Sequence, residues 1–280
     1  MEQIVQVRVP CVPACWGAEW VVGGVVRSGG TVSNYFGYVK TGCAIVGAPV
    51  TVFDDPAISR AKMAIDKARR FTPRKELWVQ RPLLERMVAW SERKPQEMRL
   101  YIKLFVLAYA FLLRLPSEAL PAVVGFDGFA CSANAVLYLD GDCLVLQLRR
   151  RKNRNGGSKL TRKCWCSASM STCPVCTFRP LVVGRAPGTP LFPDFTPSSA
   201  LQVLRVVLGG LGVPDPELYR THDLRRGHAQ DLVASGAPLH EILRAGEWSS
   251  PAFLSYLNLH KLETDMVVQA HLDESDGDES

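Results

Sequence analysis

The chain has 280 residues, 47% of them hydrophobic, which is enough to form the cores of one large domain or two smaller ones. Its formal net charge is +6, but residues 273–280 hold five acids and no base, so the rest of the chain carries +11. This charge favours a polyanionic partner. The longest apolar run, Leu104–Leu113, is too short to span a bilayer, and no secretory signal follows Met1. We therefore expect neither a membrane protein nor a secreted one.

The first part of the chain, residues 31–75, is expected to form a helical domain. Residues 1–30 are rich in Gly and Val with weak periodicity, and they stay unassigned. Helical periodicity runs from about Val32 to Ile45 and again from Ala57 to Arg70. The basic, Pro-containing segment Arg69–Lys75 then indicates a linker to the next domain.

Residues 76–272 are expected to form a second domain, mostly helical with a small sheet. A helical block runs from Arg81 to Leu113 and ends in a fully buried core helix. Val136–Leu148 has the pattern of a β-hairpin, and a third strand is expected from about Lys159. Helical patterns resume at Pro197, and the acidic tail is expected to be disordered. The predicted fold class is α+β, mostly helical, with a three-stranded antiparallel sheet.

A stretch near the C-terminus combines side chains that suit phosphodiester chemistry. His222 and Arg225 are three residues apart, so on a helix they share a face. Thr221 is the expected N-cap of that helix, which places both side chains in the first turn, where backbone N–H groups favour an anion. Gly236 is its expected end.

Two further short helices are expected after Gly236. The first covers Pro238–Ala245 and is closed by Gly246, with Trp248 at the following turn. The second is capped by Ser249 or Ser250 and carries Tyr256. The stretch thus offers an imidazole, a guanidinium, an indole N–H and a phenol, which are the groups needed to attack a phosphate with a tyrosine.

A further arginine, Arg114, directly follows the buried helix, and Ser117 and Glu118 come within the next turn. Packing and the carboxylate of Glu118 are expected to hold Arg114 rigidly.

The chain resembles the tyrosine recombinases, the phage-integrase family. The resemblance rests on an ordered set of features: Arg114, a basic hairpin, His222-x-x-Arg225, Trp248 and Tyr256. It covers roughly residues 78–270, which would be the catalytic domain, and the helical segment before it is similar in character to the core-binding domain of the family. The sequence looks most like the eukaryotic transposon-derived branch, the DIRS and Crypton types.

The resemblance implies a DNA strand-transferase from a mobile element. Tyr256 would attack the scissile phosphorus and form a 3′-phosphotyrosyl intermediate, so that rejoining needs no ATP. Arg114 and Arg225 would clamp the non-bridging oxygens. His222 would act in acid/base catalysis and hold the phosphate, and the indole N–H of Trp248 would donate to a phosphate oxygen. The implied partners are double-stranded DNA and further copies of the chain, as a tetramer. The implied location is nuclear in a eukaryote and otherwise cytoplasmic.

The segment Arg149–Lys163 carries eight basic residues and no acid, which favours contact with phosphates. We expect the DNA-binding residues to be Arg149, Arg150, Arg151, Arg154 and Lys159. A lysine of this hairpin would protonate the 5′-oxygen leaving group, since desolvation among arginines lowers the pKa of an ammonium group. Lys152 directly follows the strand and is preferred, with Lys159 as the alternative.

Two spacings differ from those of most relatives. Glu118 lies four residues after Arg114, where relatives place the carboxylate at three, and Tyr256 lies eight residues after Trp248, where relatives have nine. In an α-helix a shift by one residue rotates a side chain by about 100°.

Four cysteines, Cys164, Cys166, Cys173 and Cys176, form a C-x-C and C-x-x-C set within thirteen residues. Thiolates at these spacings can complete a tetrahedral zinc site. We therefore predict a structural zinc that staples the loop after the third strand, and no cofactor for catalysis. Cys11 and Cys15 are looser and carry no site prediction.

Three other functions compete with the recombinase. A type IB topoisomerase shares the catalytic residues, but this chain lacks the long linker expected there. A decayed recombinase would act only as a DNA-binding protein. A zinc-dependent binding module would lose its affinity for DNA on chelation and would not need Tyr256.

Overall fold

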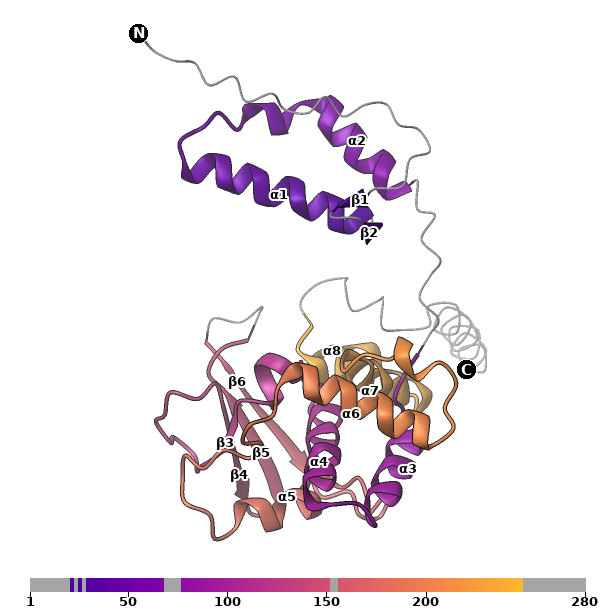
Figure 1. Cartoon of the computed structure of the whole chain (residues 1–280). Coiled ribbons are helices and arrows are strands. Elements are labelled where there is room, and N and C mark those ends of the chain that lie inside the picture. The colour runs from indigo at the N-terminus through magenta and orange to yellow at the C-terminus, as the bar shows by residue number, and fades with distance from the viewer. Residues whose placement is uncertain (1–20, 23–24, 27–28, 68–76, 152–155, 249–280) are drawn as a thin grey trace, which may run out of the picture. The chain divides into compact units, whose positions relative to one another are not determined.

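The computed structural model describes residues 21–22, 25–26, 29–67, 77–151 and 156–248 (Figure 1). The chain divides into two compact units, residues 1–75 and 76–280. Within the described ranges, no helix is long and apolar enough to cross a membrane. The predicted linker, the helices expected after Trp248 and the acidic tail fall outside these ranges.

The first unit contains two helices and a short hairpin. Strands β1 (Val21–Val22) and β2 (Val25–Val26) pair antiparallel, and α1 spans Gly29–Ile45. A 3₁₀ turn, η1 (Thr51–Asp54), leads into α2 (Pro56–Lys67). Helix α2 starts where its sequence favours it: Pro56 occupies the first position, and the Asp55 carboxylate accepts a hydrogen bond of 2.7 Å from the N–H of Ala57. Both helices cover segments for which the sequence predicted a helix, one ending at Ile45 and the other starting near Ala57.

The second unit is built around α4 (Gln96–Ala110), which packs against α3, α5, α6 and α7. The elements around it are α3 (Arg81–Ser91), α5 (Pro174–Val182), α6 (Pro197–Gly210), η3 (Pro216–Leu218), α7 (His222–Ala234) and α8 (Leu239–Gly246). Every residue from Leu104 to Leu113 is buried, which confirms the predicted core helix. The helix itself stops earlier, at Ala110, because Leu112 takes a left-handed conformation with φ 50°.

The sheet has four strands and is mixed, in the order β3-β4-β5-β6. Strands β4 (Ala135–Asp140) and β5 (Cys143–Leu148) form the predicted hairpin, and β6 (Ser158–Lys163) pairs antiparallel with β5. The prediction of three antiparallel strands was wrong in one respect, because β3 (Ala122–Val124) pairs parallel with β4. A three-residue strand is too short to show alternation, and hydrogen bonds to the loop at Thr189 and Leu191 help to hold it. The fold class is therefore α+β, mostly helical, with a small mixed sheet.

One face of the sheet packs on the helical core through Leu137, Leu144 and Leu146. Figure 1 shows the sheet beside α4, with η2 (Leu115–Ala119) leading from the end of that helix toward β3. Residue contacts join the end of α4, η2, the loop between β5 and β6, the start of α7 and the end of α8. The candidate site lies at this junction.

Candidate functional site

Arg114 is held by Glu118 in the expected manner. The backbone N–H of Arg114 donates to Oε2 of Glu118 at 2.8 Å, and Nη1 of Arg114 donates to Oε1 at 3.2 Å. Glu118 is buried, whereas the Arg114 side chain keeps 28% of its surface exposed. The link between them is η2, a π-type turn in which the N–H of Leu120 bonds to the carbonyl of Leu115. The carboxylate thus orients a guanidinium that still reaches solvent.

Helix α7 begins at His222, as predicted, and carries Arg225 into the interior. Thr221 stands at the N-cap position, but its side chain makes no capping bond, because its own backbone is already helical (φ −59°, ψ −22°). The carboxylate of Asp223, in the first turn, accepts a hydrogen bond of 2.7 Å from the N–H of Arg220, which precedes the helix. His222 is half-buried in the first turn. Gly236 ends the helix region with φ 74°, as expected.

Arg225 is almost fully buried, and the groups around it include Gly246, Trp248 and Glu118. Its Nη2 donates to the carbonyl of Gly246 at 2.9 Å, its guanidinium carbon lies 4.7 Å from the ring centre of Trp248, and its Nη1 lies 3.9 Å from Oε2 of Glu118. The structure therefore brings Arg225, Trp248 and Glu118 together, and Glu118 in turn connects them to Arg114. A cation over an indole face is itself stabilising.

Gly246 has a different role from the one expected. It is the last residue of α8, and the left-handed residue that ends the helix is Glu247, with φ 48°. A Cβ on Gly246 would lie 2.2 Å from the Trp248 ring. Glycine is thus required here because the indole packs directly against the backbone.

The structure places the hairpin arginines differently from one another. Arg149 and Arg150 are exposed, and Nη1 of Arg149 donates to the carbonyl oxygen of Cys131; their contact with DNA stays a prediction. Arg151 was expected on that surface as well, but its side chain turns inward and only 4% of it is exposed. It forms ion pairs with Glu118 (3.4 Å) and Glu247 (2.7 Å), so the guanidinium is satisfied inside the protein.

Lys159, the alternative general acid, has a geometry that does not suit that role. Its ammonium group pairs with Asp127 at 3.0 Å and lies 5.8 Å from the ring centre of Tyr138. The hydrogen bonds to Asp127 and then to Tyr138 raise the pKa of Lys159 above its ordinary value. A general acid needs the opposite shift. Three other predicted site residues lie outside the described residues: Lys152, Arg154 and Tyr256.

Two residues at the junction were missed from the sequence. Glu247 accepts from Arg151 and from the hydroxyl of Ser158, and no sequence signal marks it. Arg162 of β6 donates to the carbonyl of Ala110 at 2.7 Å and lies over the ring of Phe111 at 5.1 Å. Burial, followed by repulsion from Arg151, lowers the pKa of Arg162 to about 10, so it stays charged at neutral pH.

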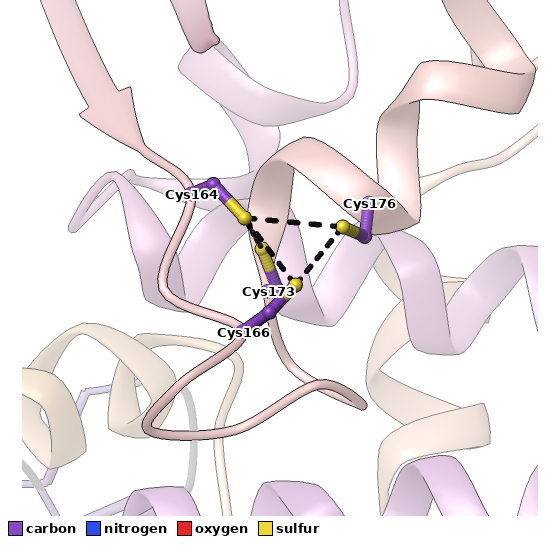
Figure 2. Close-up of side chains that lie close together, drawn as sticks. All are labelled: Cys164, Cys166, Cys173 and Cys176. Carbon is purple, nitrogen blue, oxygen red and sulfur yellow. Dashed lines mark hydrogen bonds between the residues drawn. The ribbon is translucent and has the colours of Figure 1, made fainter.

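The four predicted metal ligands do lie together. Their sulfur atoms are all within 4.8 Å of one another and are turned toward a common centre (Figure 2). The separations include 3.3 Å for Cys164 to Cys166, 3.5 Å for Cys164 to Cys173, and 4.0 Å for Cys164 to Cys176. Tetrahedral coordination with bonds of about 2.3 Å places sulfurs about 3.8 Å apart. The cluster can therefore hold a structural metal ion.

The cysteine cluster has an electrostatic environment that favours one thiolate. Cys173 is the N-cap residue of α5 and is buried. Burial opposes its ionisation, but hydrogen bonds from the backbone of Cys176 and Trp165 and from the Cys164 and Cys166 thiols outweigh this and lower its pKa to about 7. A thiol that ionises near neutral pH supplies the first anionic ligand for a metal.

The cysteine cluster also lies against α7. Trp165, between two of the cysteines, meets the ring of His228 edge to face, with 6.4 Å between ring centres. His228 stacks on Tyr109 at 4.5 Å, and its Nδ1 lies 2.7 Å from the Tyr109 carbonyl. Burial lowers the pKa of His228 to about 4, so the imidazole is neutral. The helix that carries Arg225 is thereby packed on the loop that carries the cysteines.

Comparisons with known proteins add a similarity of fold. Neither the protein-family models nor the curated proteins give a match. Among solved structures, XerH site-specific recombinase bound to difH substrate, in a pre-cleavage complex, is similar with a TM-score of 0.46 and 14% identity, over 67% of this chain and 52% of that one. XerH bound to palindromic difH substrate, in a post-cleavage complex, gives 0.46 and 14%, over 69% and 52%. The match thus spans about half the length of these structures.

Proposed function

We propose that the chain is a tyrosine-type site-specific DNA recombinase that cuts and rejoins DNA through a 3′-phosphotyrosyl intermediate. One observation carries this proposal: Arg114 and Arg225, from distant parts of the sequence, converge on the single buried carboxylate of Glu118. Trp248 packs on the second of these guanidiniums.

The charge balance of the junction supports an anionic ligand. Three guanidiniums, those of Arg114, Arg151 and Arg225, surround two carboxylates, those of Glu118 and Glu247. Arg162, the other guanidinium at the junction, adds to this positive excess, and the exposed part of the Arg114 side chain lets an anion approach it. A phosphodiester carries one negative charge, and the pentacoordinate transition state carries more. The cluster is thus better matched to the transition state than to a neutral ligand.

The chemistry follows from these groups. The phenolic oxygen of Tyr256 attacks phosphorus, the bond to the 5′-oxygen breaks, and the proton on that oxygen comes from Lys152. Arg114 and Arg225 donate forked hydrogen bonds to the non-bridging oxygens, where charge develops. His222 takes the phenolic proton and contacts the phosphate. Because the tyrosyl ester keeps the bond energy, a 5′-hydroxyl can reverse the step without ATP.

The proposed partners follow from the charge of the hairpin. Arg149, Arg150 and Arg154 bind the backbone of double-stranded DNA, and four copies of the chain assemble on two DNA sites. We place the protein in a mobile element of the DIRS or Crypton type, with a nuclear location in a eukaryote. Residues 31–75 serve as a core-binding domain and residues 76–272 as the catalytic domain.

The cysteine cluster is proposed to hold a structural zinc ion. Four sulfur ligands with one thiol already acidic fit zinc, which prefers closed tetrahedral thiolate sites in structural roles. When bound, zinc cross-links the loop after β6 to α5, and it takes no part in strand cleavage. Elemental analysis of the purified protein should give one zinc per chain, and its absence would remove this part of the proposal.

A nicked suicide substrate tests the recombinase proposal. When the short 5′-hydroxyl fragment diffuses away, the tyrosyl adduct is trapped and is seen as a shifted band on a denaturing gel. We expect the adduct with the wild type and with Tyr35→Phe, an exposed tyrosine of the first unit, and none with Tyr256→Phe. Binding of DNA without any adduct would instead support the alternative, a decayed recombinase that only binds DNA. Loss of DNA binding on chelation, with no effect of Tyr256→Phe, would support a zinc-dependent binding module.

A further inference from the structure

Arg151 occupies an unusual place for a residue in a basic hairpin. Its neighbours Arg149 and Arg150 are exposed, yet its own side chain is almost fully buried. Burial of a guanidinium requires that its hydrogen-bond donors be satisfied within the protein.

The three nitrogens of Arg151 reach three separate elements. Nε lies 3.4 Å from Oε1 of Glu118 in η2, and Nη1 lies 2.7 Å from Oε2 of Glu247, directly after α8. Nη2 donates at 3.4 Å to the carbonyl of Leu112, the left-handed residue that follows α4. The donors of a guanidinium are spread over three nitrogens in one plane, so they reach partners farther apart than the three donors of a lysine, which all leave one nitrogen.

The partners of Arg151 are themselves partners of the proposed phosphate clamp. Oε1 of Glu118, which Arg151 contacts, also accepts from Nη1 of Arg114. Oε2 of the same carboxylate faces Arg225. Glu247 stands between Gly246, whose carbonyl accepts from Arg225, and Trp248, whose ring lies under that guanidinium.

We propose that Arg151 is a positioning residue: it fixes the carboxylates of Glu118 and Glu247 and thereby sets the orientation of Arg114 and Arg225, without touching DNA itself. This inference rests on the proposed function, because the two arginines it orients are the proposed phosphate clamp. It also replaces the expectation that Arg151 contacts the DNA backbone.

If Arg151 is a positioning residue, its substitution should slow the formation of the tyrosyl adduct without changing how DNA binding depends on salt. A surface arginine that contacts a phosphate contributes about 0.9 to the slope of log affinity against log salt concentration. Arg151→Gln should leave this slope unchanged, because the side chain is buried. At saturating DNA, its single-turnover rate of adduct formation should fall about 10- to 100-fold, as is typical when a group that orients a ligand-binding residue is lost.

Three variants serve as comparisons on the same suicide substrate. Arg150→Gln should lower the salt slope, since that side chain is exposed on the same hairpin. Arg179→Gln, on an exposed face of α5, should change neither the slope nor the rate. Arg151→Lys keeps the charge but loses the fork, so its rate should lie between those of the wild type and Arg151→Gln. Thermal unfolding of each variant establishes that it is folded, and Arg151→Lys supplies the measurement if Arg151→Gln does not fold.

A double-mutant cycle separates positioning through Glu118 from a general loss of structure. Because Arg151 acts through Glu118 as well as Glu247, Arg151→Gln should slow Glu118→Gln by a smaller factor than it slows the wild type. Multiplicative effects of the two changes would overturn the proposal, as would a wild-type rate in both Arg151 variants or a salt slope that falls in Arg151→Gln. The result for the wild type separates a failure of the proposed function from a failure of the positioning role. If the wild type forms no adduct, the proposed function fails, whereas an adduct that is insensitive to Arg151 refutes the positioning role alone.

Discussion

The approach of α7 to the segment before α3 can be tested by adding one methyl group. Gly227 lies in α7, and a Cβ at this position would stand 2.0 Å from the carbonyl oxygen of Val79, 2.3 Å from its carbonyl carbon and 2.8 Å from the nitrogen of Gln80. All three atoms belong to the backbone, so a side-chain rotation cannot make room. Gly227→Ala therefore forces α7 and this segment apart.

The cost of that movement can be worked from the contacts it disturbs. Val79 is fully buried, and its N–H donates to the carbonyl of Asp223 at 3.1 Å. Overpacking costs about 1–3 kcal/mol, and loss of the hydrogen bond adds about 1 kcal/mol. Alanine favours the helix over glycine by about 1 kcal/mol. The net destabilisation is about 2 kcal/mol, which lowers the melting temperature of a unit of this size by about 4–8 °C.

Thermal unfolding followed by circular dichroism measures this change, with Gly209→Ala as the matched control. Gly209 lies in α6, where the nearest atom to an added Cβ is 3.7 Å away, on the Pro216 ring. That substitution gains helix propensity without a clash, so it should raise the melting temperature slightly. If both variants melt at or above the temperature of the wild type, the close approach at Gly227 is incorrect.

Three other predictions follow from the site. Chelation, or the substitution Cys166→Ser, should release the metal and lower the melting temperature, because the cysteine loop packs on α7. A melting temperature that stays the same when the metal is lost would contradict this. Lys159→Ala should form the tyrosyl adduct at a rate within a few-fold of the wild type, because the raised pKa of Lys159 does not suit a general acid. Lys152→Ala should form the adduct much more slowly. If Lys159→Ala is instead the slower variant on the suicide substrate, Lys159 is the general acid. Burial gives His228 a pKa of about 4 in the folded protein, against an ordinary value of 6.5. Between pH 6.5 and pH 4 the unfolded chain therefore binds more protons than the folded one, so the free energy of unfolding falls as the pH drops through this range. Urea unfolding at pH 7 and pH 5 should show a loss of about 2 kcal/mol that His228→Leu removes, and an equal loss in the variant would assign it to other groups.

The elements that the sequence predicted are those with long, regular patterns. The β4–β5 hairpin, the buried helix α4, which ends at Ala110, and the helix that starts at His222 each extend over enough residues for a period to show. Strand β3 has three residues and is defined by its neighbours in space, so local patterns do not contain it.

In the site, too, contacts between residues close in the sequence could be predicted, and contacts between distant residues could not. The pairing of Arg114 with Glu118 is local and was expected from their proximity in the sequence. The inward turn of Arg151 depends on carboxylates that lie far from it in the sequence, one of them after α8. Within a run of arginines all three side chains look alike, and only the packing of distant elements selects the one that is buried.

The spacing of four residues between Arg114 and Glu118, one more than the resemblance to the tyrosine recombinases leads us to expect, is accommodated by the backbone of η2. In a regular α-helix, one added residue rotates the carboxylate by about 100°, away from its partner. The turn Leu115–Ala119 instead closes with a bond from the N–H of Leu120 to the carbonyl of Leu115, which is the wider π-type turn. That turn takes up the added residue while both oxygens of Glu118 still reach Arg114. Spacing along the chain is therefore a poor guide to this pair: the carboxylate reaches the arginine across four residues because the backbone between them forms a π-type turn.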